Sequence, residues 1–277
     1  MAETGLVAAR GARKTGIAVF GYNRAEVLRN TLTSLQKQGR LAQVHLWLDG
    51  HQGSPNRKRE VEAVRAVAAS FPDIEVHAHA GNIGMRKMIL HGLYAMVENY
   101  DRIIVLEDDC FPTADCIDQF EKELNALTDG DNVFSVYGHP FGLPNEGRDF
   151  TRFQGWGWAT TADRLAPLLR ELLDCYLMSE KQFLAFTKEA LTPEVLRRID
   201  VTPGRQPSIT LRQFFAWDET LCLLTALRNM THRRSAKRIV YNCGAGDGAS
   251  HFDDIDHYRK PPFCMIAAHE VWDVFER

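Results

Sequence analysis

The 277-residue sequence lacks several features that would place it in well-known protein classes. It has no apolar run approaching the ~18 residues that span a bilayer. Its start is basic but contains no apolar stretch of a signal peptide. The net charge of −3 is not the basic balance of a general nucleic-acid binder. We therefore expect a cytoplasmic protein with no transmembrane segment and no nucleic-acid partner, preceded by a flexible leader over residues 1–15. Peripheral membrane association stays open.

Cysteine is present but unpatterned. The chain has six cysteines and no C-x-x-C pair. A zinc site would favour closely spaced pairs, and a disulfide framework is typical of shorter, secreted chains. We therefore expect small, buried, reduced thiols. They are Cys110, Cys116, Cys175, Cys222, Cys243 and Cys264.

The first half of the chain alternates short apolar runs with amphipathic stretches. The predicted strands are Ile17 to Phe20, Val44 to Leu48, Ile74 to His77 and Arg102 to Leu106. The predicted helices are Arg24 to Gln38, Pro55 to Phe71 and Met85 to Val97. This alternation is typical of βαβ units, and it predicts an α/β fold with a parallel sheet covered on both faces.

The second half is less regular. The predicted strands there are Val133 to Tyr137 and Ile239 to Asn242, and the predicted helices are Ala162 to Cys175, Glu180 to Ala190 and Leu211 to Asn229. No linker divides the chain, so one domain over residues 16–277 is expected.

Polar groups follow three of the predicted strands. These groups are Gly21 to Arg24, Asp49-Gly50 and Glu107-Asp108-Asp109. In open α/β sheets, ligands bind beyond the carboxyl ends of the strands. We therefore expect the functional site at this edge of the sheet.

The acidic triplet is the strongest candidate. Three successive carboxylates repel one another, and this is costly at the end of a buried strand unless a cation or hydrogen-bond donors compensate. A hard divalent ion such as Mn²⁺ or Mg²⁺ prefers oxygen ligands. Because side chains alternate along a strand, we expect Glu107 and Asp109 to point together and Asp108 to point away. The alternative is a solvated acidic turn.

Two further strand-end residues suit a nucleotide. Asp49 can accept a hydrogen bond from the imide N–H of uracil or another base, although an Asp before Gly is also a common turn pair. Arg24 can contact the base or a phosphate, although an exposed arginine at a helix start is the competing interpretation.

The segment Gly81 to Lys87 opens a predicted helix with glycines and adjacent basic side chains. Backbone N–H groups at a helix start, with Asn82, Arg86 and Lys87 beside them, suit a diphosphate. The segment has neither the P-loop spacing nor G-x-G-x-x-G, which counts against an ATPase and a dehydrogenase.

Three patterns in the second half are ambiguous from the residues alone. The aromatic segment Phe153 to Trp158, with Trp156 and Gly157, fits sugar stacking or core packing equally. Asp218 or Glu219 could act as a general base or be an ordinary helix residue. His251 could bind metal or phosphate, although a lone histidine is more often neither.

Taken in order, these segments resemble glycosyltransferases of the GT-A fold, and most nearly the inverting β-1,2-N-acetylglucosaminyltransferases and their bacterial relatives. The resemblance is carried by four segments in the family's order. They are Ile103 to Pro112, Gly155 to Trp158, Trp217-Asp218, and Gly244 to Phe252.

The resemblance implies a metal-dependent inverting transferase for a nucleotide sugar, UDP-linked and with N-acetylglucosamine as one candidate sugar. The acceptor would be a hydroxyl of a glycan, glycolipid or small molecule. It further implies metal held by Asp109, donor contacts from Glu107 and Asp108, base recognition by Asp49 and Arg24, and Asp218 as catalytic base.

In this interpretation residues 16–130 bind the donor and residues 131–277 the acceptor. The chain departs from the family where Glu219 follows Asp218, so either could be the base. Residues 138–149 and 179–207 match no family segment. A sugar nucleotidyltransferase and a non-catalytic sugar-binding protein remain as alternatives.

Overall fold

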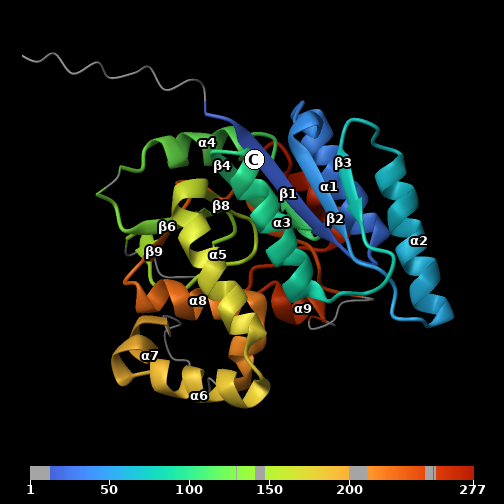
Figure 1. Ribbon diagram of the computed structural model, residues 1–277. Coiled ribbons are helices and arrows are strands. Elements are labelled where there is room, and N and C mark those ends of the chain that lie inside the picture. Colours follow the sequence, from blue (N-terminus) through green and yellow to red (C-terminus); the bar gives the residue numbers. More distant parts are fainter. Residues whose placement is uncertain (1–12, 129, 141–146, 200–210, 247–251, 253) are drawn as a thin grey trace, which may run out of the picture.

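The computed structural model describes residues 13–128, 130–140, 147–199, 211–246, 252 and 254–277 (Figure 1). Its centre is an eight-stranded sheet in the order β3-β2-β1-β4-β8-β6-β9-β7. The strands are β1 (Thr15–Gly21), β2 (Val44–Leu48), β3 (Glu75–Ala78), β4 (Arg102–Glu107), β6 (Val133–Tyr137), β7 (Asp149–Phe150), β8 (Trp158–Thr161) and β9 (Thr231–Arg234). Four of the seven neighbouring pairs are parallel.

Helices cover both faces of this sheet. The α-helices are α1 (Ala25–Lys37), α2 (Pro55–Ala69), α3 (Met85–Asn99), α4 (Cys116–Asn125), α5 (Ala162–Leu177), α6 (Glu180–Ala190), α7 (Pro193–Ile199), α8 (Trp217–Leu227) and α9 (Ile255–Tyr258). The 3₁₀ turns are η1 (Leu41–Gln43), η2 (Leu211–Phe215) and η3 (Ala268–Val274). The predicted α/β class with a mostly parallel, helix-flanked sheet is confirmed.

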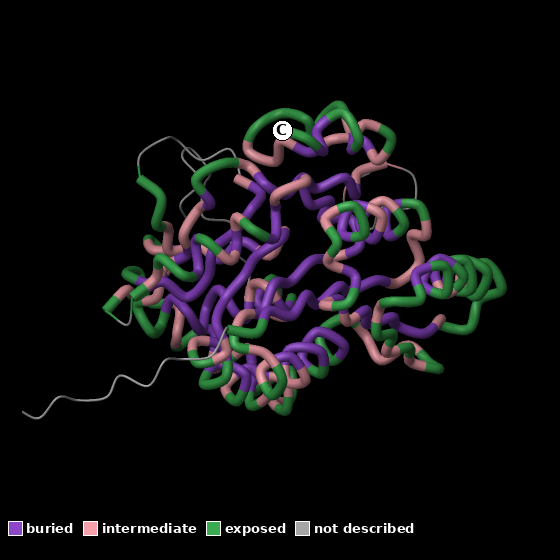
Figure 2. The backbone as a smooth tube through the Cα atoms, turned by 90° about the horizontal axis from the view of Figure 1, so that it is seen from above, coloured by how far each residue is buried: buried purple, intermediate pink, exposed green. Residues whose placement is uncertain are grey.

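Successive side chains of β1 point to opposite faces of the sheet and so contribute to two separate hydrophobic cores. Ala18 and Phe20 face a core shared with α3, α5 and α8, whereas Ile17 and Val19 face a core shared with α1, α2 and α4. Both sets are buried because the central strands are covered on both sides. Figure 2 shows buried strands between helices whose outer turns are exposed.

Two sequence predictions need correction. The predicted helix Leu211 to Asn229 is two elements, because Ala216 is extended (φ −65°, ψ 146°) and separates η2 from α8. The closing strand, β10 (Val240–Asn242), pairs with β5 (Cys110–Pro112) in a separate two-stranded sheet. Within the mostly parallel sheet, β8 lies antiparallel between β4 and β6.

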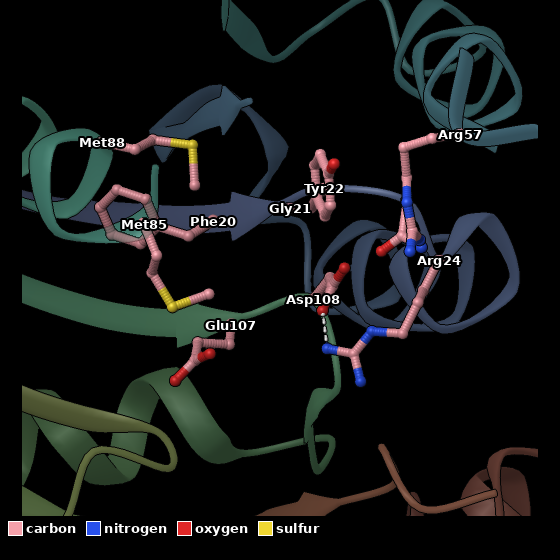
Figure 3. A pocket seen from close by; sticks show the side chains of 10 residues that line it. Phe20, Gly21, Tyr22, Arg24, Arg57, Met85, Met88, Glu107 and Asp108 are labelled. Carbon is pink, nitrogen blue, oxygen red and sulfur yellow. Dashed lines mark hydrogen bonds and ion pairs between the residues drawn. The ribbon is translucent and has the colours of Figure 1, made fainter. Parts of the chain in front are cut away.

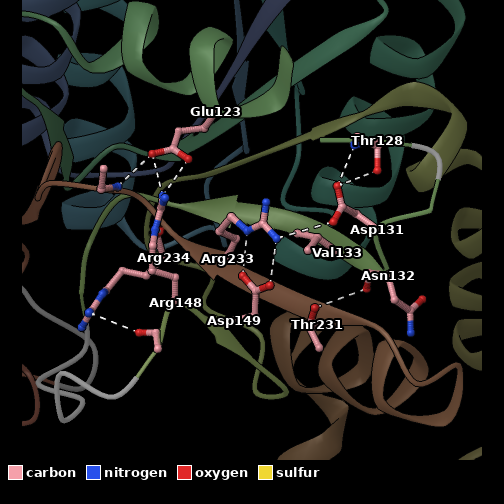
Figure 4. Close-up of polar contacts among 12 residues, drawn as sticks. Glu123, Thr128, Asp131, Asn132, Val133, Arg148, Asp149, Thr231, Arg233 and Arg234 are labelled. Atoms are coloured by element: carbon pink, nitrogen blue, oxygen red, sulfur yellow. Dashed lines mark hydrogen bonds and ion pairs between the residues drawn. The ribbon is translucent and has the colours of Figure 1, made fainter. Parts of the chain in front are cut away.

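The far edge of the large sheet is held by ion pairs (Figure 4). The Arg233 guanidinium donates to both oxygens of Asp149, at 2.7 and 2.8 Å, and so links β9 to the short edge strand β7. Arg148 donates to both oxygens of Glu123 on α4 at 2.7 Å. Bidentate arginine pairs fix orientation as well as distance.

The prediction of buried thiols is confirmed for five cysteines, whereas Cys264 is only partly buried. All six thiols are free, and five are buried. Residues 1–12 of the predicted leader lie outside the described residues, and β1 begins at Thr15. No described helix is long and apolar enough to cross a membrane.

Candidate active site

A cavity of about 200 Å³ lies at the carboxyl ends of β1 and β4 (Figure 3). Its walls come from four elements: residues 20–24 at the end of β1, Arg57 of α2, Met85 and Met88 of α3, and Glu107-Asp108 at the end of β4. Acidic and basic side chains therefore line one cavity at the carboxyl edge of the sheet, where the sequence predicts the functional site.

Arg24 bridges two carboxylates of the acidic triplet. Its Nη1 lies 2.8 Å from Asp109 Oδ2, and its Nη2 pairs with Asp108 Oδ1. The expectation that Asp108 points away from Asp109 is wrong, because β4 ends at Glu107 and the chain turns before β5. Strand alternation no longer applies beyond Glu107, so both aspartates reach the same guanidinium.

The pKa values of two carboxyl groups in the triplet are raised, so their ionised forms are disfavoured where they lie. Burial raises the pKa of Asp108 to about 6, although Arg24 lowers it. Burial also raises the pKa of Glu107 well above its usual range, and the charges of Asp109, Asp218 and Asp108 add to the effect. Burial alone would lower the pKa of Arg24, but the two aspartates raise it further than burial lowers it.

The side chains at the end of β4 suit a hard divalent cation by their chemistry, although their ligand atoms do not converge within 4.8 Å of one another as a set of three in the described structure. The donors are carboxylate oxygens, which Mn²⁺ and Mg²⁺ prefer to nitrogen or sulfur. Burial is the main cause of the raised pKa values of Glu107 and Asp108, and neighbouring carboxylates add to it, so a cation here would favour the ionised forms. Asp109 is only 8% exposed, so its carboxylate lies in a shielded position.

Asp49 lies at the end of β2, but its carboxylate is occupied by the protein. Oδ1 accepts hydrogen bonds from the backbone N–H of Gly50 and Ile83, both at 2.8 Å. Oδ2 accepts from Asn82 Nδ2 at 2.9 Å and from the Gly84 N–H at 3.0 Å. The side chain is thus positioned to hold the loop between β3 and α3.

Two glycines permit this loop arrangement. A Cβ on Gly50 would lie 2.3 Å from the backbone carbon of Gly81, so the two loops could not approach as they do. Gly84 has φ +83°, a conformation that favours glycine, and it precedes the first turn of α3. The loop is therefore built around Asp49.

The basic residues at the start of α3 are exposed. The Arg86 guanidinium lies 5.1 Å from the ring centroid of Tyr176 and 5.7 Å from that of Phe215, so it stacks on aromatic rings of α5 and η2. Lys87 lies next to it on the exposed face of the helix.

The two candidate bases are in the first turn of α8 but have different surroundings. Glu219 forms an ion pair with Arg152. Asp218 is close enough to the triplet to raise the pKa of Glu107, after burial and Asp109. The structure thus brings Asp218 close enough to the acidic end of β4 for its charge to act on Glu107.

The aromatic segment divides into core and site parts. Trp158 is fully buried in β8, as core packing predicts. Trp156 is partly exposed, with its ring centroid 5.1 Å from that of His139. Gly157 has φ +70°, and a Cβ there would lie 2.7 Å from the Val240 side chain. A Cβ on Gly155 would lie 3.4 Å from the Asp218 Cβ, so this segment flanks α8.

The terminal glycine loop is described only in part. His251 lies outside the described residues. Gly244 lies against the triplet: a Cβ there would be 1.9 Å from Asp109 Oδ2 and 2.7 Å from Arg24 Nη1. Only glycine leaves room for the Arg24–Asp109 pair.

Several cavity residues were not singled out from the sequence. Arg57 of α2 lies with its guanidinium 5.5 Å from the Tyr22 ring centroid and donates to Glu60 at 2.7 Å. Met85 and Met88 form the apolar wall. Their i, i+3 spacing was visible, but such spacing is typical of any buried helix face.

No protein-family model matches the chain, and no curated protein sequence matches it. Among solved structures, a mannosyltransferase from Pyrobaculum calidifontis in complex with GDP-Man and Mn²⁺ is 14% identical, with a TM-score of 0.41 over 78% of this chain and 73% of its own. A 4-diphosphocytidyl-2C-methyl-D-erythritol synthase from Anaerococcus prevotii is 9% identical, with a TM-score of 0.40 over 63% and 84%. Glucosyl-3-phosphoglycerate synthase from Mycobacterium tuberculosis, in complex with Mn²⁺, UDP and phosphoglyceric acid, is 12% identical, with a TM-score of 0.35 over 55% and 57%. Likeness at this level assigns the chain neither a family nor an activity.

Proposed function

We propose that the protein is a metal-dependent, inverting GT-A-type glycosyltransferase that moves a sugar from a nucleotide donor, UDP-linked in the first instance, to an acceptor hydroxyl. One observation carries the proposal. The carboxylates of Asp108 and Asp109 pair with Arg24 beside a cavity. Asp218, from a distant part of the chain, lies close enough for its charge to act on Glu107 at the end of β4.

The donor would lie at the carboxyl edge of the sheet. A divalent cation held by Asp109, beside Glu107 and Asp108, would neutralise charge on the leaving diphosphate. Arg24 orients the two aspartates, because one guanidinium contacts both.

Residues on neighbouring elements extend this surface. The loop carrying Asn82 donates its Ile83 and Gly84 N–H groups to Asp49, and this places the start of α3 near the same edge. Arg86 and Lys87 add positive charge for phosphate oxygens. Trp156 supplies a partly exposed ring for a sugar face.

Asp218 would act as the general base. Its carboxylate would take the proton of the acceptor hydroxyl as that oxygen attacks the anomeric carbon and the bond to the nucleoside diphosphate breaks on the opposite face. Asp218 is preferred to Glu219 because its charge acts on Glu107 at the end of β4, whereas Glu219 is directed to Arg152. Residues 16–130 would hold the donor and residues 131–277 the acceptor.

Two adjacent isosteric variants test this assignment. Asp218→Asn should lower transfer by ~10²–10⁴-fold, the usual contribution of a positioned base, and leave the affinity for UDP with Mn²⁺ nearly unchanged. Glu219→Gln is the matched control and should retain most of the activity. Loss of UDP binding in Asp218→Asn, in parallel with activity, would place Asp218 in the donor site instead.

The products discriminate between reaction classes. Thermal-shift screening first identifies which of the UDP-, GDP-, dTDP- and CMP-sugars raises the Tm of the wild-type protein with Mn²⁺. The protein is then incubated with these nucleotide sugars and, in separate reactions, with a nucleoside triphosphate and a sugar phosphate. Slow release of nucleoside diphosphate or monophosphate supports transfer, whereas pyrophosphate release from a nucleoside triphosphate and a sugar phosphate indicates a nucleotidyltransferase. No turnover with any substrate supports a sugar-binding protein. EDTA should stop transfer and Mn²⁺ should restore it; full activity in EDTA contradicts the metal assignment.

A further inference from the structure

A cluster of side chains of types that bind metal ions lies on the edge strand β3 and its neighbour β2, at the other end of the strand order from β7. His45 is on β2, and Glu75 and His77 are on the edge strand β3. His45 pairs in register with Glu75, and Trp47 with His77. Since residues two apart on a strand share a face, all three side chains project on the side covered by α3.

The spacing of the three side chains matches a coordination shell. His45 Nδ1 lies 3.3 Å from His77 Nε2 and 3.4 Å from Glu75 Oε2, and His77 Nε2 lies 3.2 Å from Glu75 Oε1. Ligand atoms placed tetrahedrally at ~2.0–2.1 Å from Zn²⁺ are about 3.3–3.4 Å apart. The measured separations are close to these edges, although the two histidines approach different oxygens of Glu75, and one ligand atom from each of the three residues lies within 4.8 Å of the others.

Neighbouring groups fix the two imidazoles. His45 Nε2 lies 2.5 Å from the Tyr100 hydroxyl. In the tautomer that carries its proton on Nε2, His45 donates to that oxygen and presents the Nδ1 lone pair to the cluster, and a hydrogen bond at the second ring nitrogen is what orients metal-binding histidines. The His77 ring stacks on Trp47, with centroids 4.5 Å apart and planes 14° apart.

The cluster is open to solvent on one side. The side chain of His45 is 13% exposed, that of His77 33% and that of Glu75 62%. A cation can enter from the edge of the sheet, and water can fill the fourth position. The ligand set of two imidazoles and a carboxylate favours Zn²⁺ and related first-row ions over Mg²⁺.

We propose that His45, Glu75 and His77 form a binding site for Zn²⁺ or a similar first-row divalent ion, separate from the carboxylate site at the end of β4. The ion joins the edge strand β3 to β2. Because β3 leads into the loop held by Asp49, the site stabilises the strand that carries this loop. The inference does not depend on the proposed transferase activity.

Co²⁺ serves as the probe, because its visible absorption reports histidine ligands and coordination geometry. Metal-free full-length protein is titrated with Co²⁺ in excess Mg²⁺, which competes for the oxygen-only site. Wild-type protein should bind one equivalent with strong visible bands, which Zn²⁺ abolishes. His77→Ala should weaken binding at least ~10-fold, since loss of even an outer-shell partner costs 10–100-fold.

His79→Ala is the matched control, because His79 lies just beyond β3 and outside the cluster. It should bind Co²⁺ as the wild type does. Glu75→Gln provides a second test at a largely exposed position and should also weaken binding. Absence of bands in the wild-type protein, or equal affinity in His77→Ala, would overturn the proposal and leave an ordinary His–Glu ion-pair cluster.

Discussion

The role of Asp49 separates two accounts of the donor site, and Asp49→Asn tests them. The sequence assigns this residue to base recognition. In the structure its two oxygens accept four hydrogen bonds from residues 50 and 82–84, at 2.8 to 3.0 Å. Asp49 is 3% exposed. We therefore expect it to act by holding the loop between β3 and α3.

The cost of the substitution follows from this geometry. An asparagine has one acceptor oxygen, which can retain the bonds from Gly50 and Ile83. Its NH₂ group would then face Asn82 and Gly84. Asn82 can turn its amide to present oxygen, but the Gly84 N–H cannot adapt. One unsatisfied donor and the loss of charge from the remaining bonds give a destabilisation of about 2–4 kcal/mol. For a chain of this size, Tm should fall by roughly 5–10 °C.

The assay combines thermal and urea unfolding with nucleotide affinity. Asp73→Asn, the same change at an exposed position, is the control and should leave both unchanged. If Asp49 holds the loop, Asp49→Asn loses stability and weakens UDP and GDP alike. Wild-type stability with reduced affinity for UDP alone would refute this reasoning and restore the base-recognition role.

Two other perturbations follow from buried contacts. Burial lowers the pKa of His232 from 6.5 to about 3. The unfolded chain therefore binds the proton more strongly, and stability that is present above pH 6.5 is lost as pH falls toward 3. This amounts to about 2 kcal/mol between pH 7.5 and pH 5. In urea unfolding at both pH values, His232→Gln should show a smaller loss than the wild type; an identical loss would contradict the assignment. Gly244→Ala would place a Cβ 1.9 Å from Asp109 Oδ2. It should reduce the rate of donor cleavage ~10²-fold, the effect of a 1 Å misplacement, and a wild-type rate would show that Asp109 need not be held in place.

Much of the first half could be predicted from the sequence. The strands β1 to β4 and the helices α1 to α3 occur where hydrophobic periodicity predicts them, and β2 has the predicted limits. Parallel connection then brings the ends of β1, β2 and β4 to one edge of the sheet. These features depend on local patterns and on a general rule of α/β sheets.

Other features could not be predicted because they depend on distant partners. β8 has only four residues and follows a glycine-rich segment, and its place between β4 and β6 is set by pairing. The shared contact of Arg24 with two aspartates depends on where the chain turns after Glu107. Likewise, no pattern around Asp49 shows that four donors reach it from other positions.

In the proposed function, Arg24 at the acidic end of β4 would act beside a metal ion and would not replace it. Arg24 supplies one positive charge to Asp108 and Asp109, and Glu107 and Asp218 add two further carboxyl groups to the same region. Burial is the main reason that the pKa of Asp108 is raised to about 6, and Arg24, which favours the ionised form, offsets only part of this effect. Arg24 keeps two carboxylates in place. In the proposed function, a divalent cation beside them would offset both their negative charge and that of the donor diphosphate.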